Sequence, residues 1–174
     1  MKWSKIESGT TLNINDIWGD YNQKTGEWEI LAVASNIGSS SVRALLQINS
    51  NNVKQLSLSD NVLQLESIWF ISNKCYYLSG AGIYHKKFLS DIKWKNNVLD
   101  ITRYQTTSIR GVNINDVVAV GAFGDFVHYN GISWKAKREA FLTNGSYRKV
   151  AIKGRIVVCV GGNYSKAVIT IAKR

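Results

Sequence analysis

The chain has 174 residues, of which 45% are apolar and 20% are charged, with 14 glycines, two cysteines and no proline. This composition is typical of one globular domain and excludes disordered, collagenous and disulfide-rich proteins. Its 22 basic residues exceed its 12 acidic residues by ten. No apolar run reaches the roughly 20 residues that cross a bilayer, and no apolar stretch follows the polar start as a signal peptide would. We therefore expect a soluble domain, whose compartment the sequence does not assign.

Four segments of the chain repeat the same order of short strands. Each runs from a starting motif through a nearly continuous apolar run to a more alternating run, with Gly, Asn, Asp and Ser at the turns. The starting motifs are Asp16-Ile17-Trp18-Gly19, Ser67-Ile68-Trp69-Phe70, Ser108-Ile109-Arg110-Gly111 and Ser146-Tyr147-Arg148-Lys149. Aligning Ile17, Ile68, Ile109 and Tyr147 gives spacings of 51, 41 and 38 residues. A period near 40 is typical of the blades of a β-propeller.

The repeats predict an all-β, propeller-like domain over residues 1–174, with about four blades of four strands each. The predicted blades cover residues 10–59, 60–99, 100–138 and 139–174. Helices are a poor alternative, because apolar residues seldom recur at helical spacing and the apolar runs are short and β-branched.

The last repeat ends after its third strand, whereas the two repeats before it finish on Trp94 and Trp134. The sequence around Trp3 carries the same Trp-Ser or Trp-Lys step, so residues 1–9 are predicted to complete the last blade and hide its edge. Such closure joins either the two ends of one chain or, by self-association, the ends of two chains. The alternative is that Trp3 belongs to a preceding blade and that the chain is half of a larger propeller.

The third repeat resembles a known group of propeller repeats. It contains Val117-Val118-Ala119-Val120-Gly121, followed by Gly124, His128-Tyr129-Asn130-Gly131 and Trp134. This pattern is similar to bacterial repeats grouped with the sialidase-like BNR repeats and the photosystem II assembly factor family. The resemblance is close over residues 108–134, looser over 67–94 and faint elsewhere, and it implies a propeller fold. It implies no sialidase activity, since the aspartate of a sialidase Asp-box is missing before Trp134.

The excess positive charge lies near the C-terminus, where residues 135–174 hold ten basic side chains against Glu139 alone. Clustered cations attract anionic partners, although a solvated basic face explains the same pattern. Nucleic acid is not expected, because no nucleic-acid-binding motif accompanies the charge. The candidates for anion binding are Lys135, Lys137, Arg148, Lys149, Lys153 and Arg155.

Trp18, Trp69 and Arg110 occupy one equivalent position of the repeat, which a propeller places near its axis. Together they are candidates for stacking on a sugar or binding an anionic group. Packing between blades is the alternative for the tryptophans, while Arg110 is hard to bury without a partner.

Catalytic and metal sites find little support in the sequence. His85 and His128 stand at matching positions without a third ligand or a nucleophile, and Asp16 and Asp116 fall in turns where a short acid usually bonds its own backbone. Cys75 and Cys159 lie in apolar runs, as buried thiols do. We expect no cofactor and no metal.

The sequence therefore predicts a non-catalytic binding or protein-interaction module, whose ligand is a protein, a glycan or an anionic polymer. The alternative is a glycan-active enzyme with an axial site. A glycoside hydrolase needs two carboxyl groups facing one cleft, whereas a binding module needs only exposed aromatic and basic side chains.

Overall fold

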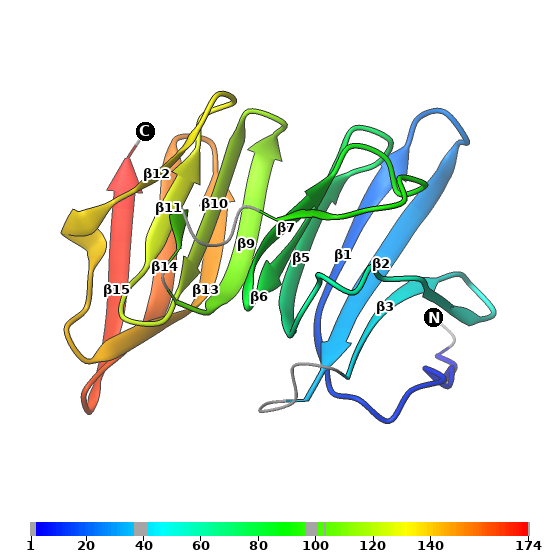
Figure 1. Ribbon diagram of the computed structural model, residues 1–174, viewed down its shortest axis with the longest axis horizontal. Coiled ribbons are helices and arrows are strands. Elements are labelled where there is room, and N and C mark those ends of the chain that lie inside the picture. The colour runs from blue at the N-terminus through cyan, green and yellow to red at the C-terminus, as the bar shows by residue number, and fades with distance from the viewer. Residues whose placement is uncertain (1–2, 37–41, 97–100, 103, 174) are drawn as a thin grey trace.

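The computed structural model describes residues 3–36, 42–96, 101–102 and 104–173. They form four antiparallel sheets in chain order, which we call blades 1 to 4 (Figure 1). Blade 1 contains β1 (Ile14–Asn22), β2 (Glu27–Ser35), β3 (Arg43–Ile48) and β4 (Val53–Leu56). Blade 2 contains β5 (Leu65–Ile71), β6 (Cys75–Gly80), β7 (Gly82–Lys86) and β8 (Lys95–Asn96). Blade 3 contains β9 (Thr106–Asn113), β10 (Asp116–Gly121), β11 (Phe126–Tyr129) and β12 (Trp134–Ala136). The short helix η1 (Arg138–Ala140) leads into blade 4, which contains β13 (Gly145–Lys153), β14 (Ile156–Asn163) and β15 (Lys166–Lys173).

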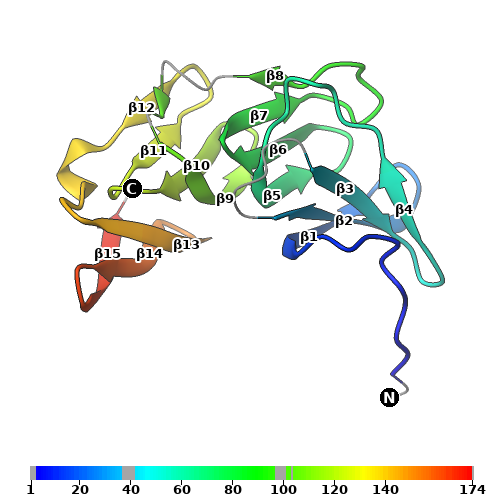
Figure 2. The same ribbon diagram turned by 60° about the horizontal axis from the view of Figure 1, so that its bottom comes forward.

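The blades stand side by side as an open arc, with blades 1 and 4 at its two ends (Figures 1 and 2). Three apolar cores fill the gaps between neighbouring blades. Ile68 and Leu31 belong to the first core, Trp69 and Ile109 to the second, and Cys159 to the third. This confirms the predicted all-β, propeller-like fold of four blades. No helix in the described part of the chain is long and apolar enough to cross a membrane.

The second strands of blades 2 and 3 are covered on both faces, as their continuous apolar runs predict, whereas in β14 of blade 4 Ile156 and Val160 are exposed. All six residues of β6 are buried, and so are the last five of β10. In β15, Ile169 and Ile171 are also exposed, while Val168, Thr170 and Ala172 on the other face are half-buried. The end blade therefore has one face that no other described part of the chain covers.

Each first strand bulges at the same place, and this bulge sets the alignment of the four repeats. The pairing with the second strand skips one residue before Asp16, Ser67, Ser108 and Lys149. Val150, and not Tyr147, is therefore the counterpart of Ile17, Ile68 and Ile109, and the predicted alignment of the fourth repeat was wrong by three residues. The last two intervals are then both 41 residues.

Glycine lies opposite the bulge in three blades because the bulged backbone comes very close there. A Cβ atom added to Gly80, Gly121 or Gly161 would lie 1.9, 2.1 or 2.1 Å from a backbone carbonyl oxygen. This contact explains the glycine at the end of each nearly apolar run.

The N-terminal segment is not paired with blade 4 in this structure. Residues 3–13 contain no strand, the side chain of Trp3 is 85% exposed, and β15 pairs with β14 alone among the described residues. Residues 1 and 2 of the predicted closing strand, and the predicted blade boundary at residues 99 and 100, lie outside the described residues.

Candidate binding site

Of the three side chains predicted near the axis, Arg110 and Trp18 lie together beside Asp16. Arg110 donates to both carboxylate oxygens of Asp16, with Nη1–Oδ2 and Nη2–Oδ1 distances of 2.8 and 2.9 Å. Its guanidinium also lies 5.1 Å from the ring centroid of Trp18. Burial raises the pKa of Asp16, but the hydrogen bonds and charge of Arg110 outweigh this and hold that pKa below its usual value. Blades 1 and 3 are thereby joined through a nearly buried ion pair.

The sequence predicted that Asp16 bonds the backbone of its own turn, but its hydrogen bonds go to other blades. Its carboxylate accepts hydrogen bonds from the backbone N–H of Ile68 and the hydroxyl of Ser67, both in blade 2. The aspartate thus joins three blades.

The two predicted tryptophans make contacts between blades. Trp69 is 2% exposed, and a Cβ atom on Gly111 would lie only 2.5 Å from its ring. Trp18 is half-buried and donates from Nε1 to the carbonyl of Phe70 at 3.1 Å. Trp69 therefore offers no open ring face to a sugar in this conformation.

The six C-terminal candidates for anion binding are all exposed. They lie on different parts of blades 3 and 4: Lys135 and Lys137 at β12, Arg148 and Lys149 in β13, and the others at the hairpin to β14. Lys137 and Arg148 line two separate cavities.

A different cluster of cations converges on blade 2. A cavity of about 230 Å³ beside the outer strands β7 and β8 has lysines around it and Tyr77, His85 and Cys75 among its walls. Asp91 is the one carboxylate among its described lining residues. We call this cavity the lysine pocket; its five lysines are Lys74, Lys86, Lys87, Lys93 and Lys95.

The pocket combines a buried cation with an aromatic wall. Lys86 is 6% exposed, donates to the backbone carbonyl of Asp91 and lies 4.9 Å from the ring centroid of Trp94. Burial lowers the pKa of Lys86, and the Asp91 charge only partly offsets this. Tyr77 and His85 stack with ring centroids 5.9 Å apart. Burial, together with the charge of Lys95, lowers the pKa of His85, so this ring is neutral at pH 7.

This pocket was missed because the sequence was judged by net charge over residues 1–134. Acidic residues in that stretch balance the five lysines in the sum, although only Asp91 is among the described lining residues of the pocket. The signal was present as five lysines between positions 74 and 95.

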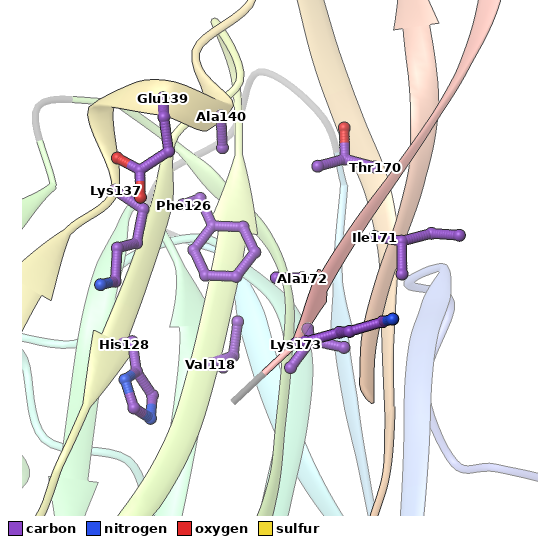
Figure 3. Close-up of a pocket in the computed structure, with 11 residues that line it drawn as sticks. Val118, Phe126, His128, Lys137, Glu139, Ala140, Thr170, Ile171, Ala172 and Lys173 are labelled. Carbon is purple, nitrogen blue, oxygen red and sulfur yellow. The ribbon is translucent and has the colours of Figure 1, made fainter. Parts of the chain in front are cut away.

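A second cavity, a groove of about 460 Å³, separates blades 3 and 4 (Figure 3). Phe126, Val118 and Ala172 form its apolar wall, and Lys137, Glu139 and Lys173 are among its charged lining residues. We call it the blade 3–4 groove.

His128 lines the same groove, and its Nε2 lies 2.9 Å from Oδ1 of Asp116. His85 instead lines the lysine pocket. Neither cavity contains two carboxyl groups among its described residues, as glycoside hydrolysis would require. No group of three or more metal-binding side chains gathers within the described ranges.

Asp125 provides a test of the electrostatics near this groove. Its side chain is buried, its Oδ2 has no hydrogen-bond partner among the described residues, and burial raises its pKa to about 6. The folded state therefore binds this proton more tightly than the unfolded state. The resulting stabilisation is complete below about pH 4 and is lost as the pH rises through 6.

We expect Asp125→Asn to stabilise the protein at pH 7 by about 1–3 kcal/mol, because it removes a buried unpaired charge. Urea unfolding of both proteins between pH 4 and 7 measures this. The difference between them isolates Asp125 from the other carboxyl groups. A difference that does not grow between pH 4 and 6 contradicts the assignment.

Comparisons with known proteins support the fold. No protein-family model and no curated protein matches the sequence. The crystal structure of the computationally designed Ika4 protein is similar over 99% of both chains, with a TM-score of 0.63 and 11% identity. A structure of YCF48 bound to D1 peptide matches 97% of this chain with a TM-score of 0.64 and 13% identity. The chain spans 57% of the YCF48 chain. At these identities the likeness establishes a propeller-type fold and leaves ligand and family open.

Proposed function

We propose that this chain is a non-catalytic protein-binding module whose lysine pocket binds an acidic segment of a partner. The observation that carries the proposal is the gathering of five lysines around one carboxylate, beside the stacked rings of Tyr77 and His85. Four of the lysines are exposed and Lys86 is buried. An anion that reaches Lys86 would gain a partly desolvated charge interaction, which is stronger than one at the open surface.

A peptide suits the shape of this site better than a single small ion. The lysines extend from the turn before β6 to β8, so several anionic groups are needed to contact them all. The propeller-type neighbour YCF48 is bound to a peptide in its structure, which supports a peptide as the class of ligand. The glycan and glycan-active alternatives lack comparable support, since Trp69 is buried and neither cavity pairs two acids.

The proposal predicts charge-dependent binding of an acidic peptide. A fluorescent peptide with alternating glutamate and glycine should bind the protein at low salt, and a glutamine version should not. We expect Lys87→Glu combined with Lys95→Glu to weaken binding by about tenfold or more. Lys135→Glu combined with Lys153→Glu is the matched control, because it makes the same charge change at exposed sites outside the pocket. Fluorescence anisotropy measures the binding of both peptides to the unmodified protein and to each double variant.

The control variant distinguishes binding at the lysine pocket from nonspecific attraction of the peptide to a basic protein. Equal losses in both double variants would show that binding follows net charge and would refute the pocket. If heparin, at the same concentration of negative charge as an unlabelled glutamate peptide, displaces the fluorescent peptide equally well, an anionic polymer would be favoured as the ligand.

The same assay predicts the direction of a pH effect. Protonation of His85 adds a cation to the site, and its pKa is below the ordinary value of 6.5. Affinity should therefore rise as the pH falls from 7 towards 5, provided that the glutamates stay ionised. His85→Gln should reduce this rise.

A further inference from the structure

Neighbouring blades are joined by one repeated hydrogen bond. A side chain on each first strand accepts the backbone N–H of the next first strand: Asp16 from Ile68 at 3.1 Å, Ser67 from Ile109 at 3.1 Å and Ser108 from Val150 at 3.2 Å. The pairs are 52, 42 and 42 residues apart in the chain. Each junction is therefore built in one register, and positions in different junctions can be compared.

The outer face of blade 1 carries residues that are buried in every other blade. Ile14 is 49% exposed and Ile17 is 53% exposed. Their counterparts in blades 2 and 3, which the bulges identify, are all 0% exposed: Leu65, Ile68, Thr106 and Ile109. Over β2 and β3 the same face is already covered, because Ala32, Ala34, Ala44 and Leu46 are 0–1% exposed in an apolar cluster against which Leu12 packs. The exposed part of this face therefore lies along β1.

Blade 4 has a matching apolar face at the other end of the arc. Its strand pairing aligns Val160 with Ile169 and Val158 with Ile171, with Ile156 beside them. Ile169 and Ile171 are 69% and 63% exposed. Exposed apolar side chains therefore lie along β1 at one end of the arc and along β14 and β15 at the other.

Among the described residues, blade 4 has no counterpart of the fourth-strand tryptophans of blades 2 and 3, each of which fills the gap between its own blade and the preceding blade. Trp94 belongs to the core between blades 1 and 2, and Trp134 packs against the core between blades 2 and 3, where its ring lies 6.1 Å from that of Tyr77. Trp134 is paired with Tyr129, whose counterpart in blade 4 is Ala172. Ala172 lines the blade 3–4 groove (Figure 3). The groove is thus the place that a fourth-strand tryptophan would occupy.

Trp3 has the sequence position of that tryptophan. Val53, Trp94 and Trp134 stand at the start of the fourth strands, and the next first strand reaches its bulge 12, 12 and 13 residues later, at Leu65, Thr106 and Tyr147. Trp3 precedes the corresponding residue, Ile14, by 11. Trp3 does not reach the blade 3–4 groove of its own chain, because residues 3–13 and β15 lie at opposite ends of the arc (Figure 2).

We propose that two copies of this chain close a ring of eight blades. The outer face of blade 4 in each copy packs on the exposed β1 side of blade 1 in the other, and residues 3–6 of the other copy pair with β15 and place Trp3 in the blade 3–4 groove. Two such junctions close a twofold dimer with eight blades, within the usual four to eight, whereas three copies would give twelve. This inference does not depend on the ligand of the lysine pocket.

The charges at the new junction fit this register. Lys149 is the counterpart of Asp16, Ser67 and Ser108, so it would stand beside Asp16 of the second copy. Asn15 and Thr107 donate to the carbonyl groups of Leu65 and Tyr147 in the next blade at 2.7 and 2.6 Å. Their counterpart Arg148 is also a donor and would face the carbonyl of Ile14 of the second copy. At the inner junctions this repeat position accepts a backbone N–H. At the proposed junction the position is Lys149, which would instead face the carboxylate of Asp16 of the second copy.

Molar mass in solution tests the assembly. Light scattering coupled to gel filtration should give twice the 19.5 kDa chain mass. Ile171→Asp and Trp3→Ala should each raise the dimer dissociation constant by at least about tenfold. Ile132→Asp, at a 90% exposed site in blade 3, should leave it unchanged. Trp3→Ala keeps the test valid if Ile171→Asp fails to fold, because Trp3 lies outside every strand of its own chain. A monomer, a larger assembly, or a dimer that tolerates both variants would overturn the proposal.

Cross-linking tests which chain supplies the closing strand. The pairing of Lys135 with His128 predicts that Ser4 lies opposite Ile171. One sample carries Ser4→Cys and the other Ile171→Cys; after mixing, dilution and reconcentration, mild oxidation should produce a disulfide-linked dimer. Ser4→Cys mixed with Ile132→Cys is the control and should not. A chain that carries both cysteines and cross-links only within itself would show closure inside one chain and overturn the proposal.

Discussion

Replacing Arg110 with alanine is expected to lower the free energy of unfolding by about 3–5 kcal/mol. The side chains of Arg110 and Asp16 are only 18% and 8% exposed, and Arg110 also donates to the carbonyl groups of Ile68 and Ile109. Its removal leaves a charged carboxylate between three blades without its counter-ion. Urea unfolding at pH 7 measures the loss, and a change below about 1 kcal/mol would contradict the role given to this pair.

Asp16→Asn, alone and combined with Arg110→Ala, shows how much of the loss comes from the ion pair. In Asp16→Asn, Arg110 loses its counter-ion but the hydrogen-bond acceptor for Ile68 is retained in part. The double variant should be less destabilised than the sum of the two single variants, because each of those leaves one charge unpaired. Strict additivity would mean that the two side chains act independently.

Trp69→Ala should cost about 3–5 kcal/mol, because it opens a cavity in the core between blades 2 and 3. The ring is 2% exposed and lies against Gly111, where a side chain would collide with it. Ile132→Ala, at a 90% exposed position, is the control and should change stability by less than about 0.5 kcal/mol. Thermal or urea unfolding distinguishes the two. A small loss for Trp69→Ala would mean that this ring is free to bind a ligand.

The strands and the number of blades could be predicted from sequence because each depends on local patterns. Short β-branched runs and turn residues recur in all four repeats, and the last two intervals are both 41 residues. The alignment of the fourth repeat could not be read in this way. The bulge adds one residue to each first strand, and matching Tyr147 to the isoleucines ignored the backbone pairing that makes Val150 their counterpart.

The contacts of the candidate sites were harder to predict because they join distant parts of the chain. Asp16 and Arg110 are 94 residues apart in sequence, and neither motif indicates the other. The sequence placed Trp18, Trp69 and Arg110 at one repeat position but could not show that the rings pack between blades. For the lysine pocket, β6 and β7 fold back so that Lys74 and Lys87 reach one cavity.

Hydrogen–deuterium exchange with the acidic peptide tests the proposed function most directly, because it locates the bound segment without any substitution. Protection should appear at residues 74–77 and 84–95, which contain the lining of the lysine pocket, and should disappear at high salt as the charges are screened. The glutamine version of the peptide should cause no change. Protection confined to residues 135–155, or no protection by a peptide that binds, would contradict the assignment of binding to the lysine pocket.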